Sequence, residues 1–293
     1  MSSISAEVVR KLREETGAGM MDCKSALVEA SGDMNAARDL LRKKGLAAAA
    51  KKAGRTAADG AVGAHIAADG SAGVLVEVNC ETDFVAKTPE FQQLVKDIAA
   101  QVAAHAPADV PALLDQPFAG TGQTVGQALQ ERISLIKENM VIRRFARFER
   151  AAGATGVVAA YIHPPAAKVG VLVELEGTPG AELSAFAKDV AMHAAAASPA
   201  AALYVAKDEV AADVLEKEKE IYRAQAAASG KPANVVDKIA EGKVKEYYAT
   251  FCLLEQPYIR EPKLTVGQHL KGRAVVRRFA RFRLGEESGT KAE

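Results

Sequence analysis

Residues 79–91, NCETDFVAKTPEF, bring a hydroxyl group, carboxylates and an aromatic ring within a few positions of one another. Thr82, Asp83 and Phe84 follow GVLVEV, whose alternating apolar residues are typical of a strand, and precede a segment with helical spacing. Two interpretations are open on the residues alone. In one, Thr82 or Asp83 caps the next helix and Phe84 folds back as a hydrophobic staple. In the other, the loop presents Phe84 and a carboxylate to a partner.

Other residues that could do chemistry are dispersed along the chain. The five histidines have no metal-ligand spacing, and GxxxxGK[ST], GxSxG and HExxH motifs are absent. His193 lies in a helical segment and is interpreted as a packed residue, whereas His163, before two prolines, is either an exposed contact or a turn residue. The three cysteines are expected to be buried, reduced side chains. We therefore expect no enzymatic activity, no cofactor and no metal site.

The bulk composition limits the classes of partner. A chain of 293 residues is long enough for two or three compact units. Its formal net charge of +1 provides no long-range attraction to nucleic acid or to an anionic membrane. No apolar run of about 18 residues is present. These features predict a soluble cytoplasmic protein without a direct nucleic-acid or membrane partner.

The N-terminal region has the punctuation of three short helices within residues 1–50, followed by a linker at 51–59. Its net charge is small, which favours a protein partner over a nucleic acid. Helix-capping side chains and terminating glycines define the three helices. The expected caps are Ser5, Asp22 and Asp33, and the expected ends are Gly17 with Gly19, Gly32 and Gly45.

An internal repeat predicts the architecture of the remainder. Each copy has the order hairpin, helix and closing strand, which indicates two related α+β core subdomains with antiparallel sheets, over 60–150 and over 151–204 with 251–285. Asp69 and Gly70 are the hairpin-turn signal of the first copy. The repeated strings are GVLVEV at 73–78 and GVLVEL at 170–175, RRFARF at 143–148 and 277–282, and TVGQ at 124–127 and 265–268.

Two further segments complete the expected organisation. Residues 205–250 interrupt only the second copy and are predicted to form an inserted antiparallel helical hairpin, broken at 229–232. Residues 286–293 are expected to be a flexible tail. Arginine and phenylalanine alternate in RRFARF, which is compatible with RNA binding, but a sheet strand with phenylalanine inward and arginine outward is the simpler interpretation.

Several of these motifs, taken in order, resemble the bacterial elongation factor Ts family. LREETGAGMMDCKSALVEASGDMNAARDLLRKKG is similar to its N-terminal module, a three-helix fold related to ubiquitin-associated domains. EVNCETDFVAKTPEF resembles the family signature, and SGKP, QPYIREP and TVGQHL are similar to later motifs. The resemblance covers nearly the whole chain.

The resemblance implies a guanine-nucleotide exchange factor that promotes GDP release from elongation factor Tu, a GTPase of translation elongation. It implies that the factor stabilises the nucleotide-free GTPase and disturbs its Mg²⁺ and phosphate site. An RNA-binding protein and a purely structural assembly protein are the alternatives from other classes. The partner-binding residues that the resemblance implies are Met20, Met21, Thr82, Asp83, Phe84, Val85 and His163.

Overall fold

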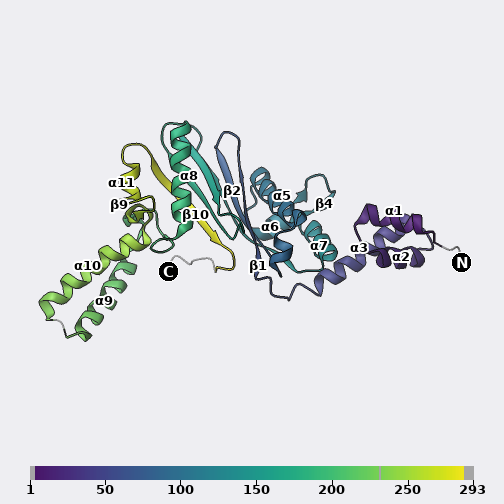
Figure 1. The fold of residues 1–293 in the computed structure, drawn as a ribbon, viewed down its shortest axis with the longest axis horizontal. Coiled ribbons are helices and arrows are strands. Elements are labelled where there is room, and N and C mark those ends of the chain that lie inside the picture. Colours follow the sequence, from purple (N-terminus) through teal and green to yellow (C-terminus); the bar gives the residue numbers. More distant parts are fainter. Residues whose placement is uncertain (1–3, 231, 287–293) are drawn as a thin grey trace. The chain divides into compact units, whose positions relative to one another are not determined.

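The computed structural model describes residues 4–230 and 232–286 and combines helices with antiparallel sheets, which confirms an α+β fold (Figure 1). The chain divides into two compact units. The first comprises the described part of 1–61 together with 77–144, and the second comprises 62–76 with the described part of 145–293. The finer division predicted from the sequence stays a prediction, and the expected tail lies outside the described residues apart from Glu286.

Two of the predicted caps form in the N-terminal helices, and two of the predicted signals are wrong. Ser5 and Asp33 cap their helices through side-chain oxygens. Asp22 lies inside the second helix, whose N-cap is Gly19, and the third helix continues through Gly45. The helices are α1 (Ala6–Thr16), α2 (Met20–Glu29) and α3 (Met34–Ala50).

Gly45 permits a close approach between α3 and α7 (Val125–Ile136) within the first unit. A Cβ atom at Gly45 would lie 2.7 Å from the Ser134 hydroxyl oxygen. Ala49, one turn further along α3, is buried. The glycine that looked like a helix terminator therefore serves helix packing. The first half of α3 closes a separate small core with α1 and α2, which contains Leu12, Cys23 and Leu27.

The two repeat copies form two three-stranded sheets with matching strand order. The first sheet has the order β1-β2-β5 and the second β10-β7-β6, so each RRFARF strand flanks the second strand of a hairpin. Gly70 adopts a positive φ of 66°, and Asp69 accepts a hydrogen bond from Ser71 N, as the turn signal predicted. The strands are β1 (Asp59–Ile66), β2 (Ala72–Cys80), β5 (Met140–Glu149), β6 (Gly156–Ile162), β7 (Val169–Glu176) and β10 (Val275–Arg283).

Both faces of the second sheet carry buried residues. On one face lies α8 (Ala181–Ala196) (Figure 1). Phe186 and Val190 of this helix share a cluster with Val173 and neighbouring residues of β7. On the other face, Leu172 joins Phe282 in a second cluster. Each large apolar side chain buried in this way contributes about 1.5–3 kcal/mol to folding. The central strand therefore needs apolar residues at successive positions, which VLVEL provides.

His193 lies in the last turn of α8 and is fully buried, which confirms that it is a packed residue. Its Nε2 atom is 3.0 Å from Gln256 Oε1, and its Nδ1 atom accepts a hydrogen bond from Ile259 N. Burial lowers the pKa of His193 below its ordinary value. The neutral ring, with Nε2 as donor, satisfies both contacts.

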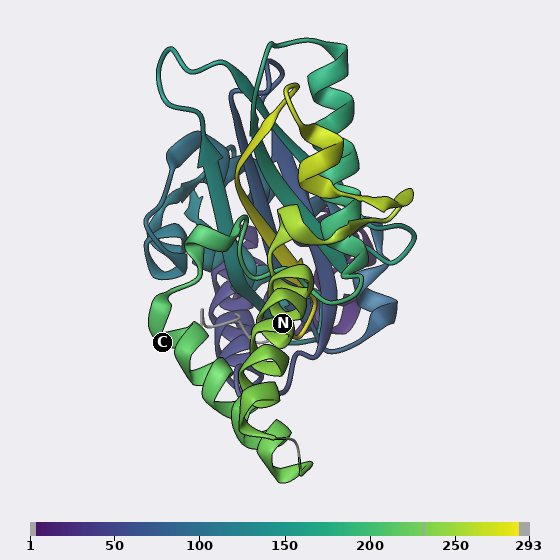
Figure 2. The ribbon, with the colours of Figure 1, turned by 90° about the vertical axis from the view of Figure 1, so that its left-hand side faces the viewer.

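The inserted segment forms an antiparallel pair of helices, α9 (Ala212–Ala228) and α10 (Ala233–Phe251), which lie side by side in Figures 1 and 2. Its base is packed, because Val214 and Tyr247 are buried with Cys252 in one cluster. Ile221, further along α9, is 48% exposed. Among the described residues, the distal part of the pair buries only small side chains, Ala226 and Ala240, whereas the base buries larger ones.

The remaining elements comprise the long helix α5 (Pro89–His105) and several short helices and strands. Among the described residues, no helix is both long and apolar enough to cross a membrane. The remaining elements are α4 (Asp83–Ala86), α5 (Pro89–His105), α6 (Val110–Asp115), β3 (Pro117–Phe118), β4 (Gln123–Thr124), η1 (Lys207–Glu209), η2 (Leu253–Glu255), β8 (Pro257–Tyr258), β9 (Glu261–Thr265) and α11 (Val266–Leu270).

Replacing residues 217–243 with a short Gly-Ser turn is expected to leave the main thermal transition nearly unchanged, because the buried base of the hairpin remains. Replacing all of 205–250 should lower the Tm further, since Val210, Val214 and Tyr247 are buried. Calorimetry of both variants checks this order. Loss of a cooperative transition in the shorter replacement would contradict it and would show that the distal helices stabilise the core.

Candidate functional site

Threonine side chains cap the two helices that follow β2. Thr82 is the N-cap of α4, and its hydroxyl accepts a hydrogen bond from Val85 N at 3.3 Å. Thr88 is the N-cap of α5 and accepts from Phe91 N at 3.3 Å. The prediction of an N-cap is confirmed at Thr82, and Asp83 is instead the first helical residue.

Phe84 is not a hydrophobic staple, because its side chain is 80% exposed. A staple joins the residue before the N-cap to the fourth helical residue, which here are Glu81 and Ala86. Phe84 occupies the second helical position and lies outside that pairing. The staple interpretation is therefore wrong, and the ring has no pocket of its own within the loop.

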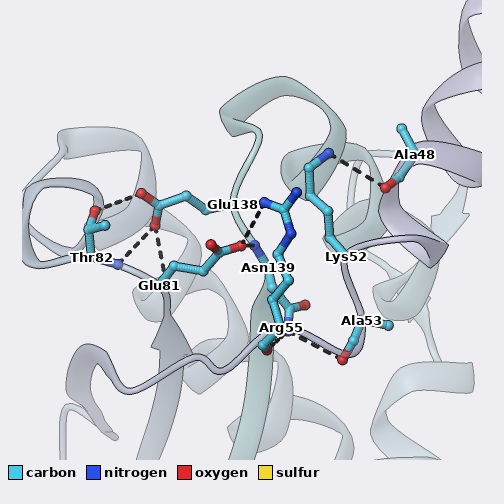
Figure 3. Close-up of polar contacts among 8 residues, drawn as sticks. All are labelled: Ala48, Lys52, Ala53, Arg55, Glu81, Thr82, Glu138 and Asn139. Atoms are coloured by element: carbon cyan, nitrogen blue, oxygen red, sulfur yellow. Dashed lines mark hydrogen bonds and ion pairs between the residues drawn. The ribbon is translucent and has the colours of Figure 1, made fainter.

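Glu138 fastens this loop from a distant part of the sequence (Figure 3). One carboxylate oxygen accepts hydrogen bonds from Glu81 N at 3.1 Å and Thr82 N at 3.0 Å. The other oxygen accepts from the Thr82 hydroxyl at 2.6 Å. Charge-assisted hydrogen bonds of this kind are stronger than neutral ones. The residues immediately before Phe84 are thus held at three points by a single side chain.

A second set of contacts links the same loop to the segment after α3 (Figure 3). Asn139 N donates to the Glu81 carboxylate at 2.6 Å, and the Asn139 side-chain amide donates to Arg55 O at 2.8 Å. The Arg55 guanidinium lies 3.5 Å from the same Glu81 oxygen. The Glu81 carboxylate therefore accepts a hydrogen bond from Asn139, just before β5, and forms an ion pair with Arg55, in the segment after α3.

Cys80, at the end of β2, contacts the loop through its thiol group. Its Sγ atom donates to Thr82 O at 3.1 Å. Burial, followed by the nearby Glu138 charge, raises the pKa of Cys80 to about 12. The side chain consequently keeps its proton at neutral pH and serves as a donor. All three cysteines are buried and unpaired, as the sequence predicted.

Asp83 carries the carboxylate beside Phe84. Its Oδ2 atom lies 2.6 Å from Lys87 Nζ, and this hydrogen bond is the main reason that the pKa of Lys87 is raised. Both side chains are largely exposed, so the pair contributes little in water. The Asp83 carboxylate is thus exposed on the surface, and its weak ion pair with Lys87 can be replaced by a stronger contact.

The other predicted contact residues lie elsewhere, apart from Val85, which is half-buried in α4. Met20 and Met21 are exposed on α2, at 43% and 72%. His163 belongs to the second unit, is exposed in the turn after β6, and has its Nδ1 atom 2.9 Å from the Tyr161 hydroxyl. Thr82, Asp83, Phe84 and Val85 therefore form one local site, whereas Met20 and Met21 lie on another element of the first unit and His163 lies in the second unit.

The RRFARF strands have the arrangement of sheet strands. Phe148 and Phe282 are buried, and the arginines face carboxylates. This pairing favours the strand interpretation over an RNA-binding stripe, because the guanidinium groups are already engaged. The pairs with distances are Arg144 with Glu77, Arg147 with Glu149 and Arg278 with Glu174, each at 2.7 Å, and Arg281 with Glu286 at 2.9 Å.

Sequence reasoning missed Glu138, Asn139 and Arg55, although they hold the loop. Glu138 bonds Thr82 across 56 positions, so no local pattern joins them. The available signal was a difference between the repeat copies immediately before RRFARF, where only the first contains Glu-Asn.

Comparison with known proteins defines the family. A family model described as "Elongation factor TS" matches residues 81–286. The chain belongs to the elongation factor Ts family. It is 50% identical to elongation factor Ts of Trichlorobacter lovleyi over 297 residues, which cover 97% of this chain and 93% of that relative. Elongation factor Ts of Thioalkalivibrio sulfidiphilus is 46% identical, with 99% of this chain and 95% of the relative covered. The family resemblance of the sequence motifs is thereby confirmed.

Phe84→Ala is expected to change the free energy of unfolding by less than about 0.5 kcal/mol, as for an ordinary surface substitution. The matched control is Phe91→Ala on the neighbouring helix. Phe91 is fully buried, and its truncation should cost about 3–5 kcal/mol. Urea unfolding of both variants compares them. A large destabilisation by Phe84→Ala would contradict the exposed position of the ring.

Proposed function

We propose that this elongation factor Ts family member is a guanine-nucleotide exchange factor for elongation factor Tu. The factor promotes GDP release by stabilising the nucleotide-free GTPase and disturbing its Mg²⁺ and phosphate site. The observation that carries the proposal is Phe84, an 80% exposed aromatic ring on a loop fixed by hydrogen bonds. The ring gains little free energy from burial in its own fold. It lies in the segment EVNCETDFVAKTPEF, which resembles the family signature, so in this proposal its pocket is assigned to the partner.

The exchange requires no catalytic residue, because it follows from linkage. A factor that binds the nucleotide-free GTPase more tightly than the GDP form weakens GDP binding by the same ratio. A population shift from 1:99 to 99:1 needs differential binding of about 5.5 kcal/mol. Burial of one phenylalanine supplies about 1.5–3 kcal/mol. The loop therefore acts together with other surfaces.

Asp83 supplies charge at the same place. In the free protein its carboxylate pairs with Lys87 in an exposed contact. A carboxylate brought near a Mg²⁺ and phosphate site changes the balance of charge that holds the ion and the nucleotide. Phe84 displaces side chains of the GTPase, and Thr82 and Val85 set the direction of the helical turn. The charge of Asp83 and the displacement of side chains by Phe84 both favour the GTPase without nucleotide.

Two further surfaces supply the remaining contacts. Met20 and Met21 give α2 an exposed apolar surface, which suits a docking role for the three-helix module at 1–50. His163 contributes a contact from the second unit. Its Nδ1 atom faces the Tyr161 hydroxyl, so we assign Nε2 to the partner. In this proposal the core subdomains at 60–150 and 151–204 with 251–285 form the rest of the interface.

The same proposal places the protein in the cytoplasm, in direct contact with the GTPase and without direct contact with nucleic acid. A structural assembly protein would bind elongation factor Tu without changing nucleotide release. An RNA-binding protein would show salt-dependent RNA affinity instead. Stopped-flow release of labelled GDP, with and without this protein, separates the three functions.

Phe84→Ala should slow GDP release at saturating factor by roughly ten- to a hundredfold, which corresponds to the ~1.5–3 kcal/mol of one buried aromatic side chain. Asp83→Asn should slow release in the same direction. The matched control is Ile221→Ala, which truncates another exposed apolar residue, 48% exposed on α9, outside the surfaces assigned to the partner. Equal release rates for Phe84→Ala and the control would refute the role of the ring.

Met21→Ser should raise the half-saturating concentration of the factor severalfold and leave the release rate at saturation unchanged. The reason is that α2 contributes affinity and does not reach the nucleotide in this proposal. Val28→Ser, at 62% exposure on the same helix, maps how far the docking surface extends. A reduced saturating rate with unchanged affinity would place Met21 in the exchange step instead.

A further inference from the structure

The internal repeat offers a comparison between two copies. The first has the recognition loop, residues 80–84 after β2, and the second lacks it. Alignment of GVLVEV with GVLVEL places residues 80–84, CETDF, opposite residues 177–181, GTPGA. The second copy thus has no threonine cap, acidic residue or phenylalanine at the corresponding positions. Its helix α8 begins after Gly180, without a side-chain cap. Both copies share the sheet, and only the first contains the loop.

The residues that fasten the loop show the same distribution. Alignment of the two RRFARF strings places Glu138 and Asn139 opposite Gly272 and Arg273. Gly272 has a positive φ of 75°, and the Arg273 guanidinium lies 4.5 Å from the centre of the Phe186 ring. The second copy therefore uses these positions for a turn and for covering its core.

Contacts that belong to the shared scaffold are present in both copies. Arg144 binds Glu77 at 2.7 Å in the first sheet, and Arg278 binds Glu174 at 2.7 Å in the second. Both TVGQ strings form a capping box at a helix start. Because the scaffold contacts are repeated and Glu138 is not, the second copy shows that this sheet and its closing strand can form without a counterpart of Glu138.

We propose that Glu138 is a positioning residue that holds the loop of Thr82, Asp83 and Phe84 in its binding conformation before the partner arrives. This inference rests on the proposed exchange function. Pre-organisation reduces the ordering that binding must otherwise bring about. Glu138 does not need to touch the partner, because it acts through the backbone of the residues preceding Phe84.

The geometry explains why loss of the Glu138 side chain should loosen the loop, although Asn139 and Cys80 also contact it. Without the Glu138 carboxylate, Glu81 N and Thr82 N lose their common acceptor, and the Thr82 hydroxyl loses its own. The helical turn that follows, α4, has only four residues. Such a short helix does not persist on its own in water. Phe84 would then sample many directions.

The first test uses the free protein and needs no partner. In Glu138→Ala, hydrogen exchange of the Glu81 and Thr82 amides should accelerate by about tenfold or more, since each loses its hydrogen bond. The matched control is Asp109→Ala, which removes the carboxylate that accepts from Ala112 N at 2.8 Å and caps α6. This control should leave the loop amides unchanged. Unchanged loop amides in Glu138→Ala would overturn the proposal.

The second test is a double-mutant cycle on GDP release from elongation factor Tu. Glu138→Ala should slow release at saturating factor by about tenfold, whereas adding Glu138→Ala to Phe84→Ala should slow it little further. Glu138→Gln keeps the side-chain shape and one acceptor, so its release rate should lie between those of Glu138→Ala and wild type. It also serves as the test variant if Glu138→Ala does not fold.

The outcomes separate the inference from the function on which it rests. Independent, multiplicative effects of Glu138→Ala and Phe84→Ala would overturn positioning through the loop. A wild-type protein that does not accelerate GDP release would refute the exchange function. In that case the hydrogen-exchange result still decides whether Glu138 orders the loop.

Discussion

A single carboxylate, that of Glu138, carries the main constraint on the recognition loop. It accepts two backbone hydrogen bonds and one hydroxyl hydrogen bond from Glu81 and Thr82. Because the loop is held from one side, Phe84 can remain exposed without the loop collapsing onto it. An exposed aromatic ring loses the free energy of burial in the free protein, and that free energy becomes available when a partner supplies the pocket. In the proposed complex, the fixed loop would thus contribute the burial of Phe84 to binding.

The duplicated scaffold separates structural from functional residues. Each copy has a central strand, β2 in the first and β7 in the second, with an RRFARF strand beside it. The strand order is the same in both sheets. The first copy adds the loop after β2, and the second copy adds the α9–α10 pair. Each addition lies at a connection between elements that the two copies share, so it leaves the hydrogen bonding of the sheets intact. Two surfaces arise from one architecture by changes in its connections.

Much of the fold could be predicted because its signals are local. Ser5, Asp33 and Thr82 cap helices through hydrogen bonds to residues two or three positions away, and the sequence displays such pairs directly. Gly45 shows the limit, since glycine marks a helix end or a close helix approach and only packing against Ser134 decides between them. Glu138 lies further beyond local reasoning, because its bonds to the loop join segments that are distant in sequence.

The central claim is that Phe84 enters the Mg²⁺ and phosphate site of elongation factor Tu. Photocrosslinking tests it most directly, with p-benzoylphenylalanine in place of Phe84 and nucleotide-free elongation factor Tu as the partner. The crosslinked peptides are then mapped by mass spectrometry. The account predicts adducts on the segments that border the Mg²⁺ and phosphate site, and their suppression by excess Mg²⁺ and GDP. Adducts confined to a different face of the GTPase would contradict it.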